Sequence, residues 1–193
     1  LLSAIALAHQ EITMQRLISL FFATPRRTLG WVALVLAGML AFGLYLQNVV
    51  GLQPCPMCIV QRYCYVLVAL LALLGAFFAS RKAHIFTYTA LLLVSAAGLF
   101  VAARQTWLQW YPPEVASCGR DFYGMIEQMP LSRAIPQIFS GSGDCSAVDW
   151  TFLGGSIANW SILCFAALIV VCFAWLFALL KNKDSQCTLL PLQ

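Results

Sequence analysis

Long runs of apolar residues dominate the chain and predict helices that cross a membrane. A transmembrane helix needs about 20 mostly apolar residues to span a hydrocarbon core of about 30 Å. Four segments meet this requirement, and Arg62 is the one charged residue in their interiors: Leu29–Val50, Ile59–Ala79, Ile85–Ala103 and Ile157–Leu180. The pattern predicts an all-α integral membrane protein with a four-helix transmembrane bundle.

Basic residues predict how the bundle is oriented, because cytoplasmic loops of membrane proteins are enriched in Lys and Arg. They precede the first segment, separate the second from the third, and follow the fourth: Arg16, Arg26, Arg27, Arg81, Lys82, Lys181 and Lys183. Both termini are therefore expected to be cytoplasmic. The expected organisation is a cytoplasmic segment 1–28, a membrane domain 29–180 with outer loops 51–58 and 107–156, and a cytoplasmic tail 181–193. Residues 1–13 precede Met14 and are expected to be processed sequence or an upstream extension without a function of their own. A cleaved signal peptide is the alternative, but the segment lacks the basic residues with which such signals begin.

Composition supports the membrane assignment. Of 193 residues, 62% are hydrophobic and 9% are charged, whereas soluble domains carry about 25% charged residues. The formal net charge of +4 follows from the orientation of the helices and gives no reason to expect nucleic acid as a partner. The expected surroundings are a lipid bilayer.

The predicted topology sorts the eight cysteines into two groups. Four face the outer side, where an oxidising compartment lets disulfides persist: Cys55, Cys58, Cys118 and Cys145. The other four are expected to be inert, because three lie within helices and one on the cytoplasmic tail, and buried free cysteine behaves as a small apolar residue: Cys64, Cys164, Cys172 and Cys187.

Three interpretations of the outer cysteines compete. Static disulfides stabilise by closing loops, and a bridge between Cys55 and Cys58 would close almost none. Structural zinc usually takes two closely spaced pairs, but Cys118 and Cys145 are far apart in the sequence. Redox catalysis is favoured, because a C-x-x-C pair is the usual form of a reactive dithiol.

The position of Cys58 strengthens the redox interpretation. It falls at the start of the second helix, where the free N–H groups and the helix dipole favour an anion. Arg62 lies four residues further on, hence on the same helix face. A charged residue at membrane depth usually marks a functional site, although snorkelling of Arg62 to the lipid headgroups is the alternative. We expect this environment to lower the pKa of the Cys58 thiol.

Electrons removed from thiols need an acceptor. The sequence has no haem attachment motif, no glycine-rich dinucleotide loop after a strand, and no ferredoxin-like run of cysteines. No metal is expected. A quinone dissolved in the membrane fits a reactive dithiol at the membrane surface beside an arginine, whose charge would stabilise a developing quinone oxyanion.

Several motifs together resemble the DsbB family of bacterial disulfide bond formation proteins. They are Pro54-Cys55-Pro56-Met57-Cys58-Ile59-x-Gln61-Arg62, Leu108-Gln109-x-Tyr111-Pro112, Pro136-Gln137-x-Phe139-x-x-Ser142-Gly143-Asp144-Cys145 and Asp149-Trp150-x-Phe152-Leu153-Gly154. The resemblance covers most of the chain from Met14 onward. It implies a bacterial inner-membrane thiol:quinone oxidoreductase that reoxidises a DsbA-type periplasmic thiol oxidase and passes the electrons to ubiquinone or menaquinone.

The resemblance also implies roles for individual residues. Reduced DsbA would attack Cys118, which is paired with Cys145. Cys145 would then exchange with Cys55 of a Cys55–Cys58 disulfide, leaving Cys58 as the thiolate next to the quinone with Arg62 supporting it. Some family members carry a histidine near the outer end of the third helix, where this chain has Gln105 after Arg104, so no histidine is expected in the quinone site.

Other functions share some of these features. A small transporter or scaffold with stapled loops would also have four helices and four outer cysteines. A zinc-binding protein would bind metal through its reduced cysteines. A vitamin K epoxide reductase-type enzyme is also a quinone-linked four-helix bundle, but its C-x-x-C lies at the fourth helix, whereas here it opens the second.

Overall fold

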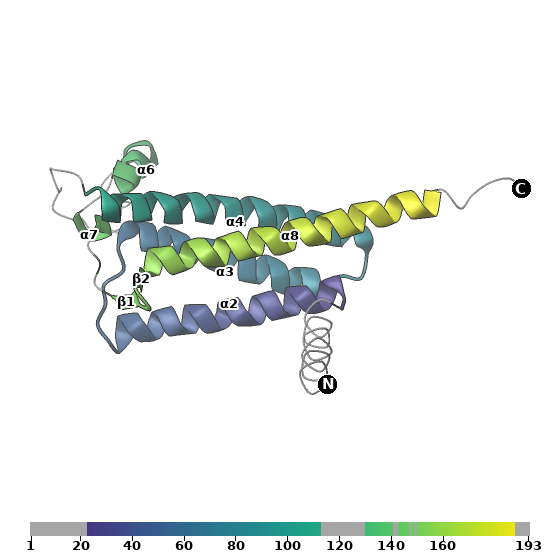
Figure 1. The fold of residues 1–193 in the computed structure, drawn as a ribbon, viewed down its shortest axis with the longest axis horizontal. Coiled ribbons are helices and arrows are strands. Elements are labelled where there is room, and N and C mark those ends of the chain that lie inside the picture. Colours follow the sequence, from purple (N-terminus) through teal and green to yellow (C-terminus); the bar gives the residue numbers. More distant parts are fainter. Residues whose placement is uncertain (1–22, 113–129, 141–142, 147, 149, 188–193) are drawn as a thin grey trace, which may run out of the picture.

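The computed structural model describes residues 23–112, 130–140, 143–146, 148 and 150–187. Within them, the elements follow in the order α2 (Pro25–Asn48), α3 (Pro56–Phe77), α4 (Arg81–Trp110), α6 (Leu131–Ser140), α7 (Gly143–Ser146), β1 (Thr151–Phe152), β2 (Gly155–Ser156) and α8 (Ile157–Cys187). Four helices in this part of the chain are long and apolar enough to cross a membrane, namely α2, α3, α4 and α8 up to Lys181. The predicted four-helix bundle is confirmed (Figure 1).

Each of the first three long helices begins at a side-chain cap. The Oγ1 atom of Thr24 accepts a hydrogen bond from the N–H of Arg27, and the Oγ atom of Ser80 accepts one from Ala83. At the start of α3, the Sγ atom of Cys55 forms the cap by accepting a hydrogen bond from the N–H of Cys58. Pro25 and Pro56 follow two of these caps, where a fixed φ and a missing N–H suit the first helical turn.

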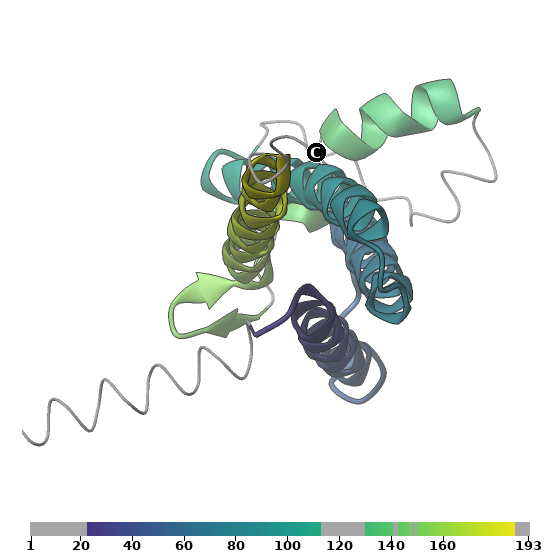
Figure 2. The same ribbon diagram turned by 90° about the vertical axis from the view of Figure 1, so that its right-hand side faces the viewer.

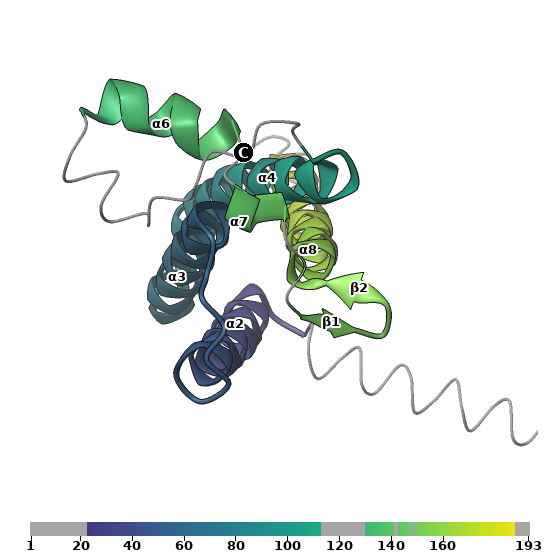
Figure 3. The same ribbon diagram turned by 90° about the vertical axis from the view of Figure 1, so that its left-hand side faces the viewer.

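The four long helices lie side by side in chain order, with contacts between α2 and α3, α3 and α4, and α4 and α8. Viewed from either end, they form an arc with α2 and α8 at its two ends (Figures 2 and 3). The main core lies along this arc: Leu29, Leu36, Tyr65, Val68, Ala72, Tyr88, Leu91, Ala102, Phe165 and Cys172. Large apolar side chains such as Phe86 and Phe177 are exposed on the outside, as expected where lipid replaces water.

The helix boundaries differ from the predicted segments at the ends. The α4 helix continues through Trp110, so the first residues of the predicted outer loop 107–156 are still helical. The α8 helix runs to Cys187, which is past the predicted start of the tail. Polar and charged residues extend both helices beyond the apolar segments, and apolar length therefore underestimates helix length.

One end of the bundle carries the shorter elements of the described residues. The α6 and α7 helices, the β1–β2 hairpin and the connection from α2 to α3 gather there, whereas the connection from α3 to α4 lies at the opposite end together with the start of α2 and the end of α8 (Figure 1). The start of α2 and the end of α8 thus lie at the same end of the bundle. Which side faces the cytoplasm stays a prediction from the basic residues. Residues 1–22, which include the expected extension 1–13, lie outside the described residues.

The β1–β2 hairpin was not predicted. Thr151 pairs with Ser156, and Phe152 pairs with Gly155. Its two-residue turn has positive φ at both Leu153 (50°) and Gly154 (79°), which is the backbone of a type I′ turn. The Nε1 atom of Trp160 on α8 donates to the backbone oxygen of Phe152 at 3.0 Å, and this contact fixes the hairpin against the bundle.

Candidate redox site

The Cys55 and Cys58 pair occupies the first turn of α3. The Sγ atom of Cys55 caps the helix by accepting a hydrogen bond from the N–H of Cys58 at 3.2 Å. The two sulfur atoms lie 2.7 Å apart, with the Cys55 thiol donating to Cys58. A disulfide needs about 2.05 Å, so only a small movement separates this arrangement from a bond. The pairing itself stays a prediction.

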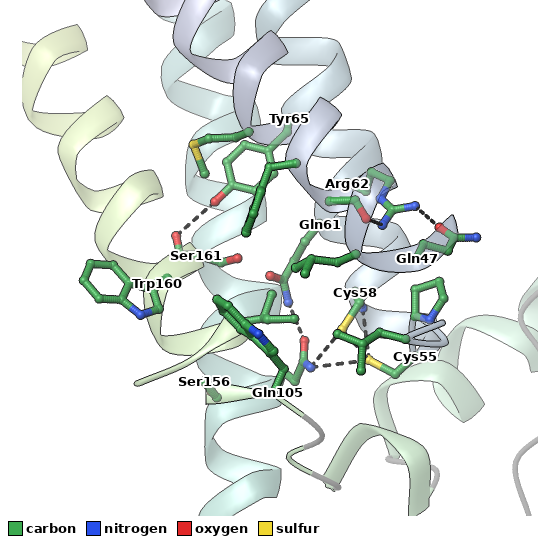
Figure 4. Close-up of a pocket in the computed structure, with 18 of the residues that line it drawn as sticks. Gln47, Cys55, Cys58, Gln61, Arg62, Tyr65, Gln105, Ser156, Trp160 and Ser161 are labelled. Atoms are coloured by element: carbon green, nitrogen blue, oxygen red, sulfur yellow. Dashed lines mark hydrogen bonds between the residues drawn. The ribbon is translucent and has the colours of Figure 1, made fainter. Parts of the chain in front are cut away.

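A buried glutamine on α4 contacts both sulfurs. The Nε2 atom of Gln105 lies 3.1 Å from the Sγ atom of Cys58 and 3.3 Å from that of Cys55. Its Oε1 atom accepts a hydrogen bond of 2.6 Å from Nε2 of Gln61 on α3. Both glutamines are 3% exposed, and Figure 4 shows their amides and the two sulfurs connected by hydrogen bonds.

A third sulfur lies close by. Cys145 is fully buried on α7 and packs in a second core cluster with Cys55, Met57, Ile138 and others. Hydrogen bonding with Cys145 and Cys58, together with burial, raises the pKa of the Cys55 thiol far above its usual range. The structure therefore brings together three of the four predicted cysteines. Cys118 lies outside the described residues.

A cavity of about 330 Å³ opens beside the Cys55 and Cys58 sulfurs. Its walls come from α2, the 51–58 loop, α3, α4, the hairpin region and α8, and its aromatic lining consists of Phe42, Tyr65, Trp150, Phe152 and Trp160. Apolar surface predominates in the lining, and its polar side chains other than the two cysteines are Gln47, Gln53, Gln61, Arg62, Gln105, Gln109, Ser156 and Ser161. A mostly apolar cavity with few convergent polar groups is typical of a small-molecule site.

The sequence was compared with those of known proteins. Residues 25–175 match the family described as Disulfide bond formation protein DsbB. A protein named Disulfide bond formation protein B from Polaromonas naphthalenivorans is 68% identical over 144 residues, which cover 75% of this chain and 86% of that protein. A protein of the same name from Albidiferax ferrireducens is 57% identical over 162 residues, or 84% of this chain and 93% of that protein.

The chain belongs to the DsbB family. It is therefore a multi-pass membrane protein of disulfide bond formation, with the disulfide-forming oxidoreductase activity that this family implies. The predicted family and fold are thus confirmed. The sequence interpretation of the cysteines as redox-active agrees with this family, while the electron acceptor, the protein partner and the roles of single residues need separate arguments.

Arg62 lies in the same cavity but is directed toward α2 (Figure 4). Its Nη1 atom donates to Oε1 of Gln47 at 2.6 Å, and its Nη2 atom donates to the backbone oxygen of Gly43 at 3.5 Å. The sequence analysis expected Arg62 to support the Cys58 sulfur. In the DsbB-family site described here, the hydrogen-bond donor that contacts this sulfur from another helix is Gln105.

Sequence reasoning missed the amides that surround this DsbB-family site. Gln61 was part of a quoted motif and Gln105 was noted as a departure, but neither had a role, and Gln47 was not considered. A signal was available, because polar residues inside membrane helices are rare and usually functional. This signal did not predict the hydrogen bond between Gln61 and Gln105, because nothing in the sequence shows that these two residues of different helices are in contact.

Of the remaining cysteines, Cys64, Cys164 and Cys172 are not part of the cavity lining. Cys172 is buried in the main core, with Cys64 and Cys164 partly buried against it; Cys187 ends α8. Their predicted inertness stays a prediction. Among the described residues, no group of three or more His, Cys, Asp or Glu side chains is placed to hold a metal ion. This does not test zinc binding, since Cys118 is outside the described part of the chain.

Proposed function

We propose that this protein is a thiol:quinone oxidoreductase of the bacterial inner membrane. It reoxidises a DsbA-type periplasmic dithiol oxidase and delivers the electrons to ubiquinone or menaquinone, which sustains disulfide formation in secreted proteins. The observation that carries the proposal is the opening of the Cys58 sulfur into an apolar, aromatic-lined cavity at the end of a transmembrane bundle.

The cavity fits a quinone head group. Its volume of about 330 Å³ lies in the range of about 300–1,000 Å³ found for small-molecule sites. The aromatic side chains suit a flat ring, and the amides of Gln47 and Gln105 and the guanidinium of Arg62 suit its carbonyl oxygens. Phe42 lines the cavity and is 51% exposed on the lipid side of α2, so an isoprenoid tail has a route into the bilayer. A bound quinone supplies an acceptor for two electrons and two protons.

Thiol exchange brings the electrons to Cys58. One thiolate of reduced DsbA attacks Cys118 of a Cys118–Cys145 disulfide, and the second DsbA thiolate resolves the mixed disulfide, leaving DsbA oxidised and Cys118 and Cys145 reduced. Cys145 then attacks Cys55, the Cys55–Cys58 bond breaks, and its electron pair leaves on the Cys58 sulfur. Cys118 reforms its bond with Cys145, which releases Cys55 as a thiol. The two electrons of the DsbA dithiol thus reside on Cys55 and Cys58.

The described residues support the second exchange. The buried sulfur of Cys145 packs in one cluster with Cys55, and the raised pKa of Cys55 favours this sulfur as the protonated member of the pair. Negative charge then falls on Cys58, where the first turn of α3 and the N–H of Gln105 stabilise it.

Quinone reduction tests the proposal directly. Purified protein mixed with a reduced DsbA-type protein and a ubiquinone analogue is expected to bleach the quinone absorbance, and Cys58→Ser is expected to abolish this. Cys64→Ser is the matched control, because Cys64 lies on the same helix outside the cavity lining, and it should retain activity. Wild-type protein that leaves both ubiquinone and menaquinone analogues oxidised would refute the acceptor assignment.

The partner is tested by trapping. With Cys145→Ser, Cys118 is a free thiol whose thiolate attacks the disulfide of the oxidised DsbA-type protein and releases one partner thiol. Because Cys145 is absent, no internal thiol displaces the partner from Cys118, so a disulfide-linked complex should accumulate and disappear on reduction. Cys164→Ser serves as the control that traps nothing. Absence of any complex, in protein that still reduces quinone with a small dithiol, would refute the partner while leaving the chemistry intact.

A further inference from the structure

Two buried amides form a connected unit with the reactive sulfurs. Gln61 and Gln105 are each 3% exposed, and a buried amide is costly unless it is hydrogen-bonded. Gln61 donates to Oε1 of Gln105 at 2.6 Å, and Gln105 donates to the sulfurs of Cys58 and Cys55 at 3.1 and 3.3 Å. The unit therefore runs from α3 to α4 and back to the start of α3 (Figure 4).

The hydrogen bond from Gln61 fixes which end of the Gln105 amide faces the sulfurs. A carboxamide has a donor end and an acceptor end of nearly equal size. Because the Oε1 atom of Gln105 already accepts from Gln61, its NH₂ group is the end that faces Cys58. If the amide turned over, a partially negative oxygen would oppose a sulfur that must carry negative charge.

Arg62 does not take this place. Its guanidinium donates to Gln47 and to the Gly43 carbonyl on α2, and Figure 4 shows it directed toward Gln47. The donor that α4 offers to the sulfurs is therefore a neutral amide, which keeps its N–H at every pH at which the protein is folded.

We propose that Gln105 is a catalytic residue that stabilises negative charge on the Cys58 sulfur through its N–H, and that Gln61 is a positioning residue that holds the Gln105 amide in the donating direction. The assignment rests on the proposed function, because it gives Cys58 the role of electron donor. Gln61 acts only through Gln105, so its removal matters only while Gln105 is present.

A double-mutant cycle tests this dependence. The variants are Gln105→Leu, Gln61→Met and the two combined, with Asn48→Leu as the control, because Asn48 is an exposed amide outside the cavity lining. The readouts are the rate at which iodoacetamide alkylates Cys58 in the reduced protein at neutral pH, by peptide mass spectrometry, and kcat and KM for quinone. Thermal unfolding in detergent identifies any variant that fails to fold.

Gln105→Leu is expected to slow alkylation of Cys58 and kcat by roughly tenfold, the scale of one hydrogen bond to a charged group. Gln61→Met is expected to slow both by a smaller factor, and the double variant should be no slower than Gln105→Leu alone. If Gln105→Leu folds poorly, Gln105→Glu is the substitute. It keeps the shape of the side chain and the hydrogen bond from Gln61 but places an acceptor against the sulfur, so it should slow alkylation of Cys58 at least as much.

Two outcomes overturn the proposal: unchanged Cys58 alkylation in folded Gln105 variants, or multiplicative losses in the double variant. These outcomes are distinct from failure of the proposed function. If wild-type protein reduces no quinone, the proposed function fails. The alkylation rates of the four variants still show in that case whether Gln61 acts on Cys58 through Gln105. If wild-type protein reduces quinone and the cycle shows no coupling, the amide assignment alone fails.

Discussion

Cys55 and Cys58 differ in their surroundings although they are only three residues apart. Both sulfurs accept a hydrogen bond from Gln105, and the Cys55 sulfur also accepts from the N–H of Cys58. The two differ in the bond between them, in which the Cys55 thiol donates and the Cys58 sulfur accepts. A donor contact keeps a proton on sulfur, and acceptor contacts favour its loss. The direction of the hydrogen bond between the two sulfurs thus divides the pair into a proton-bearing member, Cys55, and a charge-bearing member, Cys58.

The two thiols should therefore differ in reactivity as pH rises. The pKa of Cys55 is raised, so this thiol is expected to stay protonated as pH passes the usual cysteine value of about 8.5, and only a thiolate is alkylated readily. Limited iodoacetamide treatment of the reduced, folded protein at mildly alkaline pH should modify Cys58 well before Cys55. Peptide mass spectrometry measures the ratio.

Denatured protein is the control for this ratio, because both thiols then titrate normally and should react alike. Equal rates in the folded protein, or faster reaction at Cys55, would contradict the division of roles between the two sulfurs.

The sequence predicted the reactive residues better than their contacts. The C-x-x-C spacing and its place at a helix start followed from local patterns, and so did the depth of Arg62. The direction of Arg62 toward Gln47 and the meeting of Gln61 with Gln105 depend on how α2, α3 and α4 pack, and a single sequence carries no direct record of that packing.

Close packing of α4 and α8 depends on a glycine. A Cβ atom at Gly98 would lie 2.4 Å from the ring of Phe165, which is fully buried and stacks on Tyr65 with ring centroids 4.3 Å apart. Tyr65 lines the cavity. A side chain at Gly98 would therefore displace a stack that reaches the redox site.

Gly98→Ala is accordingly expected to destabilise the bundle by about 1–3 kcal/mol, the usual cost of overpacking. The measurement is the thermal unfolding midpoint in detergent, with quinone KM as a second readout through Tyr65. Gly38→Ala is the matched control, since a Cβ atom there meets nothing within 4 Å and alanine favours the helix. Equal midpoints for the two variants would show that α4 and α8 tolerate separation.

At the level of elements, apolar length predicted the four spanning helices, because crossing a bilayer requires it. It did not predict how far α4 and α8 continue, since polar residues extend a helix as well as apolar ones do. The hairpin escaped detection because its strands have two residues each and its turn places Leu153, a residue that rarely adopts positive φ, in the left-handed region.

For the whole molecule, the orientation in the membrane is the open prediction. In a variant without native cysteines, Gln53→Cys should react with a membrane-impermeant maleimide in spheroplasts, because the 51–58 loop is expected to be periplasmic. Lys82→Cys, in the first turn of α4 at the other end of the bundle, is its counterpart, and both positions are exposed. The cysteine of Lys82→Cys should react only after the membrane is permeabilised, because the positive-inside bias predicts that this position is cytoplasmic. The reverse labelling pattern would invert the topology.

The segment between α4 and α8 serves two tasks at once. It presents the Cys145 sulfur to Cys55, and a few residues later it supplies Trp150 and Phe152 to the cavity wall, anchored through Trp160. Any shift of this segment that an incoming protein causes therefore alters the shape offered to the small molecule. Thermodynamic linkage makes such an effect reciprocal. If binding of the protein partner changes the affinity of the cavity for its small molecule by some factor, a bound small molecule should change the affinity for the protein partner by the same factor.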